Sequence, residues 1–391
     1  MKLRSIFMRF LTDKTEPVYY SLLDLLRFLA AVSVMTLHYF AGSFKDTASG
    51  YGLWFGHGYL GVELFFLISG FVIYNSLKDN WRDYAWSRFV RLYPLFWILC
   101  TFTYALSVIY NQLGYIDAPL PFYKYLLNLF IINNGQTANM IDGSYWTLTI
   151  EIFFYLYIGL FTYIVGKRNL IYFFGAWLLY TFLAFRFGFH DLLISKLLLV
   201  RYSSYFTFGA CFALLLENIY SLNKREEPKI KKESLKIKEL FIKFFLPIKF
   251  MLLSVYLIHF NSKTLNDYAS THIVTNQFNI FNPLALHIMD YIFILFIISI
   301  PCSILINKIA KKINLKLVLK ILKILGLATY PLYLLHQRVA SILISPYSGL
   351  GILNIYTLSA AIVMIAFSLY IGVIDADLRR YLKIKFYKNN I

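Results

Sequence analysis

Residues 20–40 read YSLLDLLRFLAAVSVMTLHYF, and this stretch decides the class of the protein. It is predominantly apolar, and its length is what an α-helix needs to cross about 30 Å of hydrocarbon at about 1.5 Å per residue. We therefore expect a membrane-spanning helix here. Ionisable side chains inside such a helix cost free energy, so the acid, the base and the histidine in this stretch need an explanation.

These three side chains are spaced so that they share a face of the helix. Arg27 and His38 are eleven residues apart. In a regular α-helix they fall within about 20° of one face and about 16 Å apart along the axis. Asp24 precedes Arg27 by three residues, close enough to pair with it. We expect one helix face to hold polar groups at two depths, with Asp24 orienting Arg27.

The composition of the whole chain is that of a membrane protein. Of 391 residues, 59% are hydrophobic and 19% aromatic, and the mean hydropathy is +0.61, too apolar for a soluble protein of this size. We expect an all-α polytopic membrane protein, 1–391, forming a single membrane-embedded domain. Apolar runs of about 18 to 25 residues predict about ten transmembrane helices near 20–40, 58–77, 91–112, 144–166, 169–185, 192–217, 247–261, 284–307, 322–344 and 351–374.

Positive charge is distributed unevenly between the predicted loops. The chain carries 38 Lys and Arg against 20 Asp and Glu, a net charge of +18. The excess lies before the first span, after the second, in a basic link near 218–249, near 308–320 and after 374. By the positive-inside rule, both termini and this link are predicted to be cytoplasmic. The net charge is then mostly a topology signal, and nucleic-acid binding is not expected.

Several other ionisable groups fall inside the predicted spans. With the predicted topology, His38, Glu63, Glu151, Arg201 and His336 all lie toward the outer side of the membrane, Arg201 in the outer half of the sixth span. Arg88 and Arg91 stand at the inner mouth of the third span, on one face. Such groups usually face a cavity or a partner. The sequence therefore predicts an outer polar cluster with two arginines on the cytoplasmic side.

Each of these residues also has an ordinary interpretation. A lone histidine at the end of a span is commonly interfacial, paired arginines at a span end commonly set topology, and Glu63 could mark the membrane interface. Arg201 could neutralise a buried carboxylate. Cys100, Cys211 and Cys302 lie singly in apolar runs without metal-ligand spacing, so neither disulfide chemistry nor a metal site is expected.

Five motifs in these regions resemble those of the acyltransferase-3 family of integral membrane O-acyltransferases. Residues 23–31, LDLLRFLAA, followed by His38, resemble its opening signature, and 61–73, GVELFFLISGFVI, its second motif. Residues 88–94, RFVRLYP, are similar to its paired-arginine motif. The stretches 144–155, SYWTLTIEIFFY, and 330–336, YPLYLLH, resemble two later blocks. The motifs follow the family order, and Glu63 stands where an Asp is commoner.

This resemblance implies about ten helices, a coenzyme A thioester donor and His38 as the central catalytic residue. We expect transfer of an acyl group, acetyl foremost, from acetyl-CoA to a hydroxyl of a cell-surface glycan such as lipopolysaccharide or of its lipid-linked precursor, in a bacterial inner membrane. The expected partners are acyl-CoA, the glycan acceptor and membrane lipid, with no tightly bound cofactor. We assign His38 and Glu151 to catalysis, Arg27, Arg88 and Arg91 to donor binding, and Asp24, Glu63, Trp146, Arg201 and His336 to support or acceptor binding.

The chemistry of these residue types suits the expected reaction. Acyl transfer to a hydroxyl needs a base, and histidine, with an ordinary pKa near 6.5, can serve at neutral pH. Arginines suit the phosphates of the donor and a developing oxyanion. Direct transfer is favoured over an acyl-enzyme because no Ser or Cys has an evident activating neighbour. Two other classes stay open: a transporter, since intramembrane charges also mark transport paths, and a glycan-assembly scaffold without catalysis.

Overall fold

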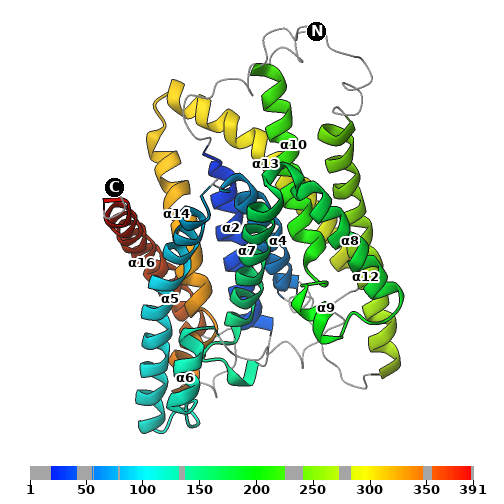
Figure 1. Ribbon diagram of the computed structural model, residues 1–391. Helices are drawn as coiled ribbons and strands as arrows, with labels where there is room; N and C mark the ends of the chain where they lie inside the picture. The colour runs from blue at the N-terminus through cyan, green and yellow to red at the C-terminus, as the bar shows by residue number, and fades with distance from the viewer. Residues whose placement is uncertain are drawn as a thin grey trace, which may run out of the picture. The chain divides into compact units, whose positions relative to one another are not determined.

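The computed structural model describes residues 19–41, 55, 57–77, 80–131, 137–224, 241–272, 283–346 and 355–388. Every regular element in these ranges is a helix (Figure 1), which confirms the predicted all-α class. The first element, α2 (Ser21–Thr36), begins one residue after the predicted start of the first span. It continues as a π-helical turn, η1 (Leu37–Ala41).

The described ranges contain nine helices that are long and apolar enough to cross a membrane. Each of them overlaps one of the ten predicted spans, since apolar length is a strong signal for this class of helix, but the third begins at Trp81 instead of 91 and the last ends at Phe386 instead of 374. The nine are Ser21–Phe40, His57–Asn75, Trp81–Gln112, Gly143–Val165, Lys167–Arg186, Ile242–Ser262, Leu286–Ala310, Lys316–Leu335 and Ile355–Phe386.

The predicted sixth span, 192–217, is not one helix. It is divided into α9 (Leu193–Leu197) and α10 (Ser203–Lys224), and Leu199 between them has a φ of 53°. A positive φ is incompatible with a continuing right-handed helix. The prediction failed here because residues 198–202, LLVRY, contain neither a glycine nor a proline that would mark the interruption.

The contacts between residues divide the chain into two compact units. Unit 1 comprises Met1–Leu23, Glu63–Trp81 and Phe153–Leu315, and unit 2 comprises Asp24–Val62, Arg82–Ile152 and Lys316–Ile391.

In chain order, the remaining helices are η3 (His57–Tyr59), α4 (Leu60–Asn75), α5 (Trp81–Gln112), α6 (Phe122–Leu129), η4 (Thr137–Asn139), η5 (Gly143–Tyr145), α7 (Trp146–Val165), η6 (Lys167–Asn169), α8 (Leu170–Arg186), η7 (Phe241–Phe245), α12 (Leu246–His272), α13 (Pro283–Lys312), α14 (Lys316–Leu335), α15 (Arg338–Ile344) and α16 (Ile355–Lys388).

Unit 1 is held together by aromatic packing around α10. The rings of Phe154 on α7 and Phe206 on α10 stack with their centroids 4.0 Å apart. Gly209 of α10 lies directly against the backbone of α4, where any side chain would collide with the carbonyl oxygen of Leu67. Small residues at such crossings let membrane helices approach closely.

Unit 2 is built around α14, which packs along α16 and against α2. At Gly372 the backbone of α16 touches that of α14 around Leu327. Gly326 of α14 meets the side chain of Asp24 on α2 in the same way. The first polar side chain of the opening motif is therefore buried against a helix that comes some 300 residues later in the chain.

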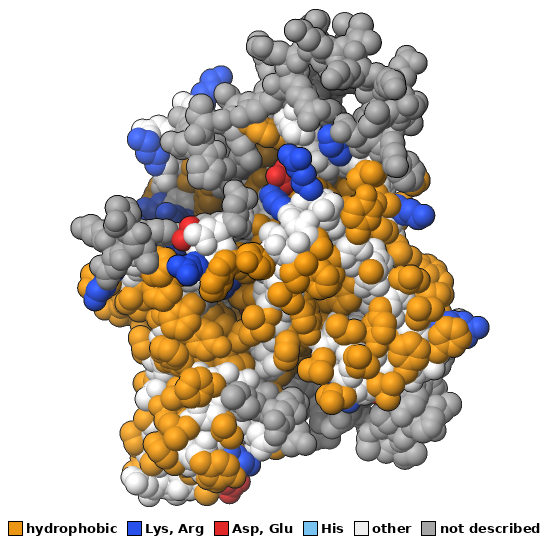
Figure 2. All heavy atoms as spheres, viewed as in Figure 1, with side chains coloured by type: hydrophobic (Ala, Val, Ile, Leu, Met, Phe, Trp, Pro, Cys, Tyr) orange, Lys and Arg blue, Asp and Glu red, His pale blue; other side chains and the backbone are white. Residues whose placement is uncertain are grey.

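Large apolar side chains remain exposed along the long helices. On α13 they include Tyr291, Ile294, Leu295 and Ile298, which recur at helical spacing. Figure 2 shows hydrophobic side chains spread over much of the visible surface of the described helices. Exposed apolar surface on this scale fits helices that face lipid.

The central part of the basic link predicted near 218–249 lies outside the described residues, which stop at Lys224 and resume at Phe241. The same is true of the basic stretch before the first span. The cytoplasmic location of the link and of both termini stays a prediction.

Candidate active site

His38 lies on the π-helical turn that ends the first span. Two hydroxyls just before it bond back to the helix: Ser33 Oγ donates to the Ala30 carbonyl at 2.8 Å, and Thr36 Oγ1 donates to the Ser33 carbonyl at 2.9 Å. Such back-bonding competes with the regular backbone hydrogen bonds and loosens a helix locally. Single π turns are frequent at functional sites, and the imidazole of His38 is exposed on this one.

The second histidine, His336, faces His38. Their ring centroids are 5.2 Å apart and the ring planes are inclined by 43°. His336 is fully buried, and its Nδ1 lies 2.8 Å from the carbonyl oxygen of Tyr333. A carbonyl only accepts, so Nδ1 carries the hydrogen and Nε2 of the neutral ring is an acceptor. Nε2 has no hydrogen-bond partner within the described residues.

The structure corrects the prediction of how His336 is held. The sequence places it inside a continuous span, 322–344, whereas α14 ends at Leu335 and α15 begins at Arg338. His336 therefore sits in the break between two helices. The predicted meeting of His38 and His336 is nevertheless found, because the break lies beside the π turn of the first span.

A buried carboxylate, Asp142, adjoins this histidine pair and was not singled out from the sequence. Its Oδ1 accepts the backbone N–H of Ser144 at 2.8 Å, and its Oδ2 accepts the backbone N–H of Arg338 at 2.7 Å. Burial raises the pKa of Asp142, while these hydrogen bonds and the nearby His38 act in the opposite direction. The sequence signal was its position as the N-cap of η5, immediately before a predicted span.

Hydrogen bonds around Tyr333 join the start of α7 to the end of α14. Tyr333 OH lies 2.7 Å from Thr147 Oγ1 and donates to the Ser144 carbonyl at 3.1 Å. Ser144 Oγ in turn donates to the Tyr333 carbonyl at 3.2 Å. Both Thr147 and Tyr333 are buried, so these bonds fix the two segments that carry Asp142 and His336. Trp146, which was expected to support the site, is the first residue of α7, lies between Ser144 and Thr147 in the chain, and is half-buried.

The arginine of the first span is paired as the sequence predicts. Arg27 Nη1 lies 3.7 Å from Asp24 Oδ1, one helical turn away. Both side chains are largely buried, and the backbone of α14 at Gly326 packs closely against the side chain of Asp24. The pair therefore holds the guanidinium in a defined place within unit 2.

Arg88 lies on α5 together with an aromatic partner. Its guanidinium carbon is 5.6 Å from the centre of the Tyr84 ring, within cation–π range, and its Nε donates to Ser87 Oγ at 3.3 Å. Glu151 of α7 acts electrostatically on the same tyrosine. The structure thus associates Glu151 with the Arg88 end of α5, and its predicted role beside His38 or the acceptor stays a prediction.

Arg91 faces charged groups of the last helix. It acts electrostatically on Asp375 and Arg379 of α16, which are themselves joined by an ion pair of 2.8 Å between Arg379 Nη2 and Asp375 Oδ2. Asp375 is 1% exposed. From the sequence, Arg379 belongs to a basic tail after 374. It joins the arginine group because α16 continues as a helix to Lys388.

Glu63 and Arg201 belong to unit 1. Both act electrostatically on Tyr202, which lies next to Arg201 in the chain. Arg201 is not in a helix, contrary to the prediction that it lies in the outer half of a span. It occupies the turn before α10, is 44% exposed, and pairs with the exposed Asp191 at 2.7 Å. Two of the five residues predicted to form the outer cluster, His38 and His336, are thus brought together within unit 2.

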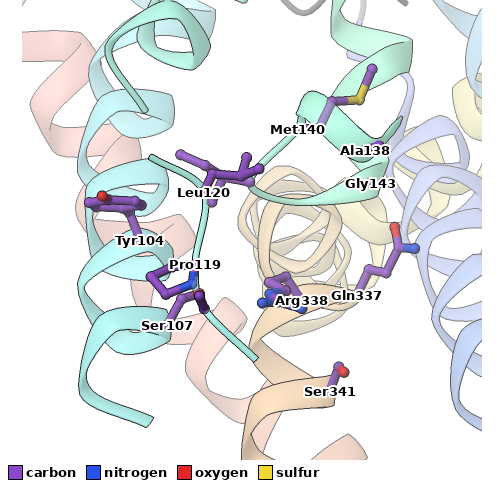
Figure 3. A pocket seen from close by; sticks show the side chains of 12 residues that line it. Tyr104, Ser107, Pro119, Leu120, Ala138, Met140, Gly143, Gln337, Arg338 and Ser341 are labelled. Atoms are coloured by element: carbon purple, nitrogen blue, oxygen red, sulfur yellow. The ribbon is translucent and has the colours of Figure 1, made fainter. Parts of the chain in front are cut away.

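A pocket of about 460 Å³ opens within unit 2 beside this pair. Its wall includes Gly143, which follows Asp142, and Gln337 and Arg338, which follow His336. Figure 3 shows Gln337, Arg338 and Ser341 on the α14–α15 side of the pocket and Tyr104 and Ser107 on α5. The size is typical of a small-molecule site.

The fold and this site define a polytopic membrane protein with a histidine pair, a buried carboxylate and a group of arginines. The family model described as an acyltransferase domain matches residues 20–373, nearly the whole chain, and the chain belongs to this acyltransferase-3 family.

One viral protein is also similar to part of the chain. The "Putative acetyltransferase ORF330" of Acidianus two-tailed virus is 27% identical over 119 residues, which are 30% of this chain and 34% of that protein. The chain thus spans about a third of the length of this curated relative. No solved structure matches the chain.

Proposed function

We propose that this protein is a membrane O-acyltransferase that moves an acyl group, acetyl foremost, from a coenzyme A thioester to a hydroxyl of a cell-surface glycan or of its lipid-linked precursor. The observation that carries the proposal is the meeting of His38, on its π turn, with His336 and Asp142. Membership of the acyltransferase family supports the reaction class.

In the proposed reaction, His38 is the general base. Its imidazole takes the proton of the acceptor hydroxyl as that oxygen bonds to the thioester carbonyl carbon. The carbon–sulfur bond then breaks, and His38 returns the proton to the leaving thiolate. Proton transfer by a positioned side chain accelerates such reactions by about 10²–10⁴-fold.

His336 and Asp142 have distinct roles in this proposal. Asp142 stabilises the positive charge that His38 gains in the transition state, as a buried carboxylate beside an imidazolium can. His336 Nε2, with its lone pair available, accepts a hydrogen bond from the substrate or from His38. The hydrogen bonds of Tyr333 with Ser144 and Thr147 keep both groups in place.

The donor is proposed to bind along the arginines of unit 2. Coenzyme A carries several phosphate charges, and guanidinium groups bind phosphate through charge-assisted hydrogen bonds. Arg27, Arg88 and Arg91 were assigned this role from the sequence, and the link between Arg91 and Arg379 adds a fourth candidate. Acetyl-CoA would be a substrate that leaves as free coenzyme A.

The proposed location is a bacterial inner membrane, with the arginines toward the cytoplasm and the histidine pair toward the outer side. The charge pattern of the loops supports this orientation. A donor made in the cytoplasm and a glycan exported across the membrane could then meet at His38. Modification of lipopolysaccharide, capsule or another polysaccharide would fit equally.

The test is acyl transfer in membranes supplied with labelled acyl-CoA. We expect His38→Asn to lower transfer by about 10²–10⁴-fold at equal abundance. We expect Arg27→Gln to raise the donor KM, since it removes a charge that binds phosphate. His287→Asn, an exposed histidine on α13, is the matched control and should transfer normally. Full transfer by the His38 variant would refute the mechanism, and label trapped on the protein with donor alone would replace direct transfer by an acyl-enzyme.

A further inference from the structure

The pocket beside the histidine pair has a lining suited to a sugar. Its described wall combines an aromatic ring, hydroxyls and an amide, from Tyr104, Ser107, Ser341 and Gln337, with apolar contacts such as Leu120. Hydroxyls and amides can both donate and accept hydrogen bonds, as a polyhydroxylated ligand requires. The volume, about 460 Å³, accommodates one or two sugar rings in an elongated ligand.

One cation distinguishes this pocket from a neutral sugar site. Among the described residues that line it, Arg338 carries the one formal charge. The backbone N–H of Arg338 is engaged by Asp142, but within the described part of the chain its guanidinium has no ion-pair partner. In Figure 3 the side chain lies between Gln337 and the α5 residues. A half-buried guanidinium without an internal anion is suited to an anion supplied by a ligand.

The chain connects this cation directly to the reacting groups. Arg338 is two residues after His336, whose ring is 5.2 Å from that of His38. Gly143, which also lines the pocket, packs against the side-chain amide of Gln337. A Cβ atom added at Gly143 would lie 2.7 Å from Gln337 Oε1. A ligand held by Arg338 would therefore lie beside the segments that carry Asp142 and His336.

We infer that this pocket binds the acceptor and selects a saccharide that carries an anionic group, a carboxylate or a phosphate, which pairs with Arg338. The inference rests on the proposed function and deepens it by naming the substrate class. The pocket segments are the outer end of α5, the loops before α6 and before α7, and the start of α15, which the predicted topology places on the side opposite the donor.

The test measures binding without requiring transfer. The purified full-length protein is titrated by ligand-detected NMR with methyl β-D-glucuronide, glucose 1-phosphate and the neutral methyl β-D-glucoside. We expect at least one anionic probe to bind about tenfold or more tightly than the neutral one, because a charged hydrogen bond is worth about 1.5–3 kcal/mol, or about 10- to 150-fold. The two anionic probes distinguish a carboxylate from a phosphate.

Matched variants assign the preference to this residue. Arg338→Gln should abolish it, Arg338→Lys should retain part of it, and Arg186→Gln, an exposed arginine at the end of α8, should leave it intact. Each Arg338 variant keeps the backbone N–H that donates a hydrogen bond to Asp142, so the position of this carboxylate is preserved. Equal binding of the neutral probe, or a preference that survives Arg338→Gln, would overturn the inference.

A parallel assay of labelled acyl transfer to native glycan separates the two proposals. Transfer without an anion preference would leave the proposed function standing and remove this inference. An Arg338-dependent anion preference in a protein that transfers nothing would do the reverse, leaving a binding pocket without acyl transfer.

Discussion

At the scale of single residues, the site depends on buried polar groups whose hydrogen bonds are specified. Asp142 has both carboxylate oxygens occupied by backbone N–H groups and also acts on His38. His336 has one ring nitrogen occupied and the other available. Such groups hold their geometry because an unsatisfied buried partner costs about 1–3 kcal/mol.

The substitution Asp142→Asn tests the role of this carboxylate. It removes the charge and turns an NH₂ group toward one of the two backbone donors. We expect the transfer rate to fall by about 10- to 100-fold, because a charged hydrogen bond is worth about 1.5–3 kcal/mol. The donor KM should change little, since the arginines are untouched. Kinetics in membranes at equal abundance would measure both constants.

The control for this substitution is Asp117→Asn, in an exposed loop of the same unit. It should leave the kinetics unchanged. An Asp142 variant with an unaltered rate would show that His38 needs no carboxylate beside it.

At the scale of elements, the sequence predicted helix positions far better than helix interruptions. Apolar length located nine candidate spans, because a membrane imposes that length, although some of their ends lie about ten residues from the predicted ones. The breaks at Leu199 and His336 are not marked by a glycine or a proline, and the π turn at His38 follows local hydroxyl back-bonding that the apolar pattern does not record. The same limit explains why Asp142 and Arg379 were missed, whereas the Asp24–Arg27 pair, set by one helix turn, was predicted.

The packing of α2 against α14 gives a prediction at this scale. Gly326→Val would drive a branched side chain into Asp24, and overpacking of this kind costs about 1–3 kcal/mol. We expect a lower Tm and, because Asp24 holds Arg27, a raised donor KM. Ile321→Val, on the exposed side of α14, is the control and should change neither quantity. A Gly326 variant with normal Tm and KM would contradict the close approach of the two helices.

At the scale of the whole molecule, the proposed reaction requires one fixed orientation of the protein in the membrane. The proposed donor site and the proposed acceptor pocket lie in opposite halves of α5, with Arg88 and Arg91 in the first half and Tyr104 and Ser107 in the second. From Arg88 to Ser107 the helix rises about 28 Å, close to the hydrocarbon thickness of about 30 Å. Donor and acceptor could therefore approach from opposite sides of the membrane.

The orientation itself is a prediction from the loop charges. Reporter domains fused to the N- and C-termini should both be active on the cytoplasmic side, and a cysteine introduced at exposed Asp117 should react with an impermeant thiol reagent added from outside. The same reagent should fail to reach a cysteine at exposed Arg168, on the short turn between α7 and α8. The opposite labelling pattern would place the donor arginines on the wrong side.

The most direct measurement of the central claim is the mass of the surface glycan made by cells that express the wild-type protein or His38→Asn at equal abundance. We predict that glycan repeats from cells with the wild-type protein are heavier by one acyl unit, and that this increment is absent with the His38 variant. Identical glycan masses in the two strains, whether both acylated or both bare, would contradict His38-dependent acyl transfer to a surface glycan.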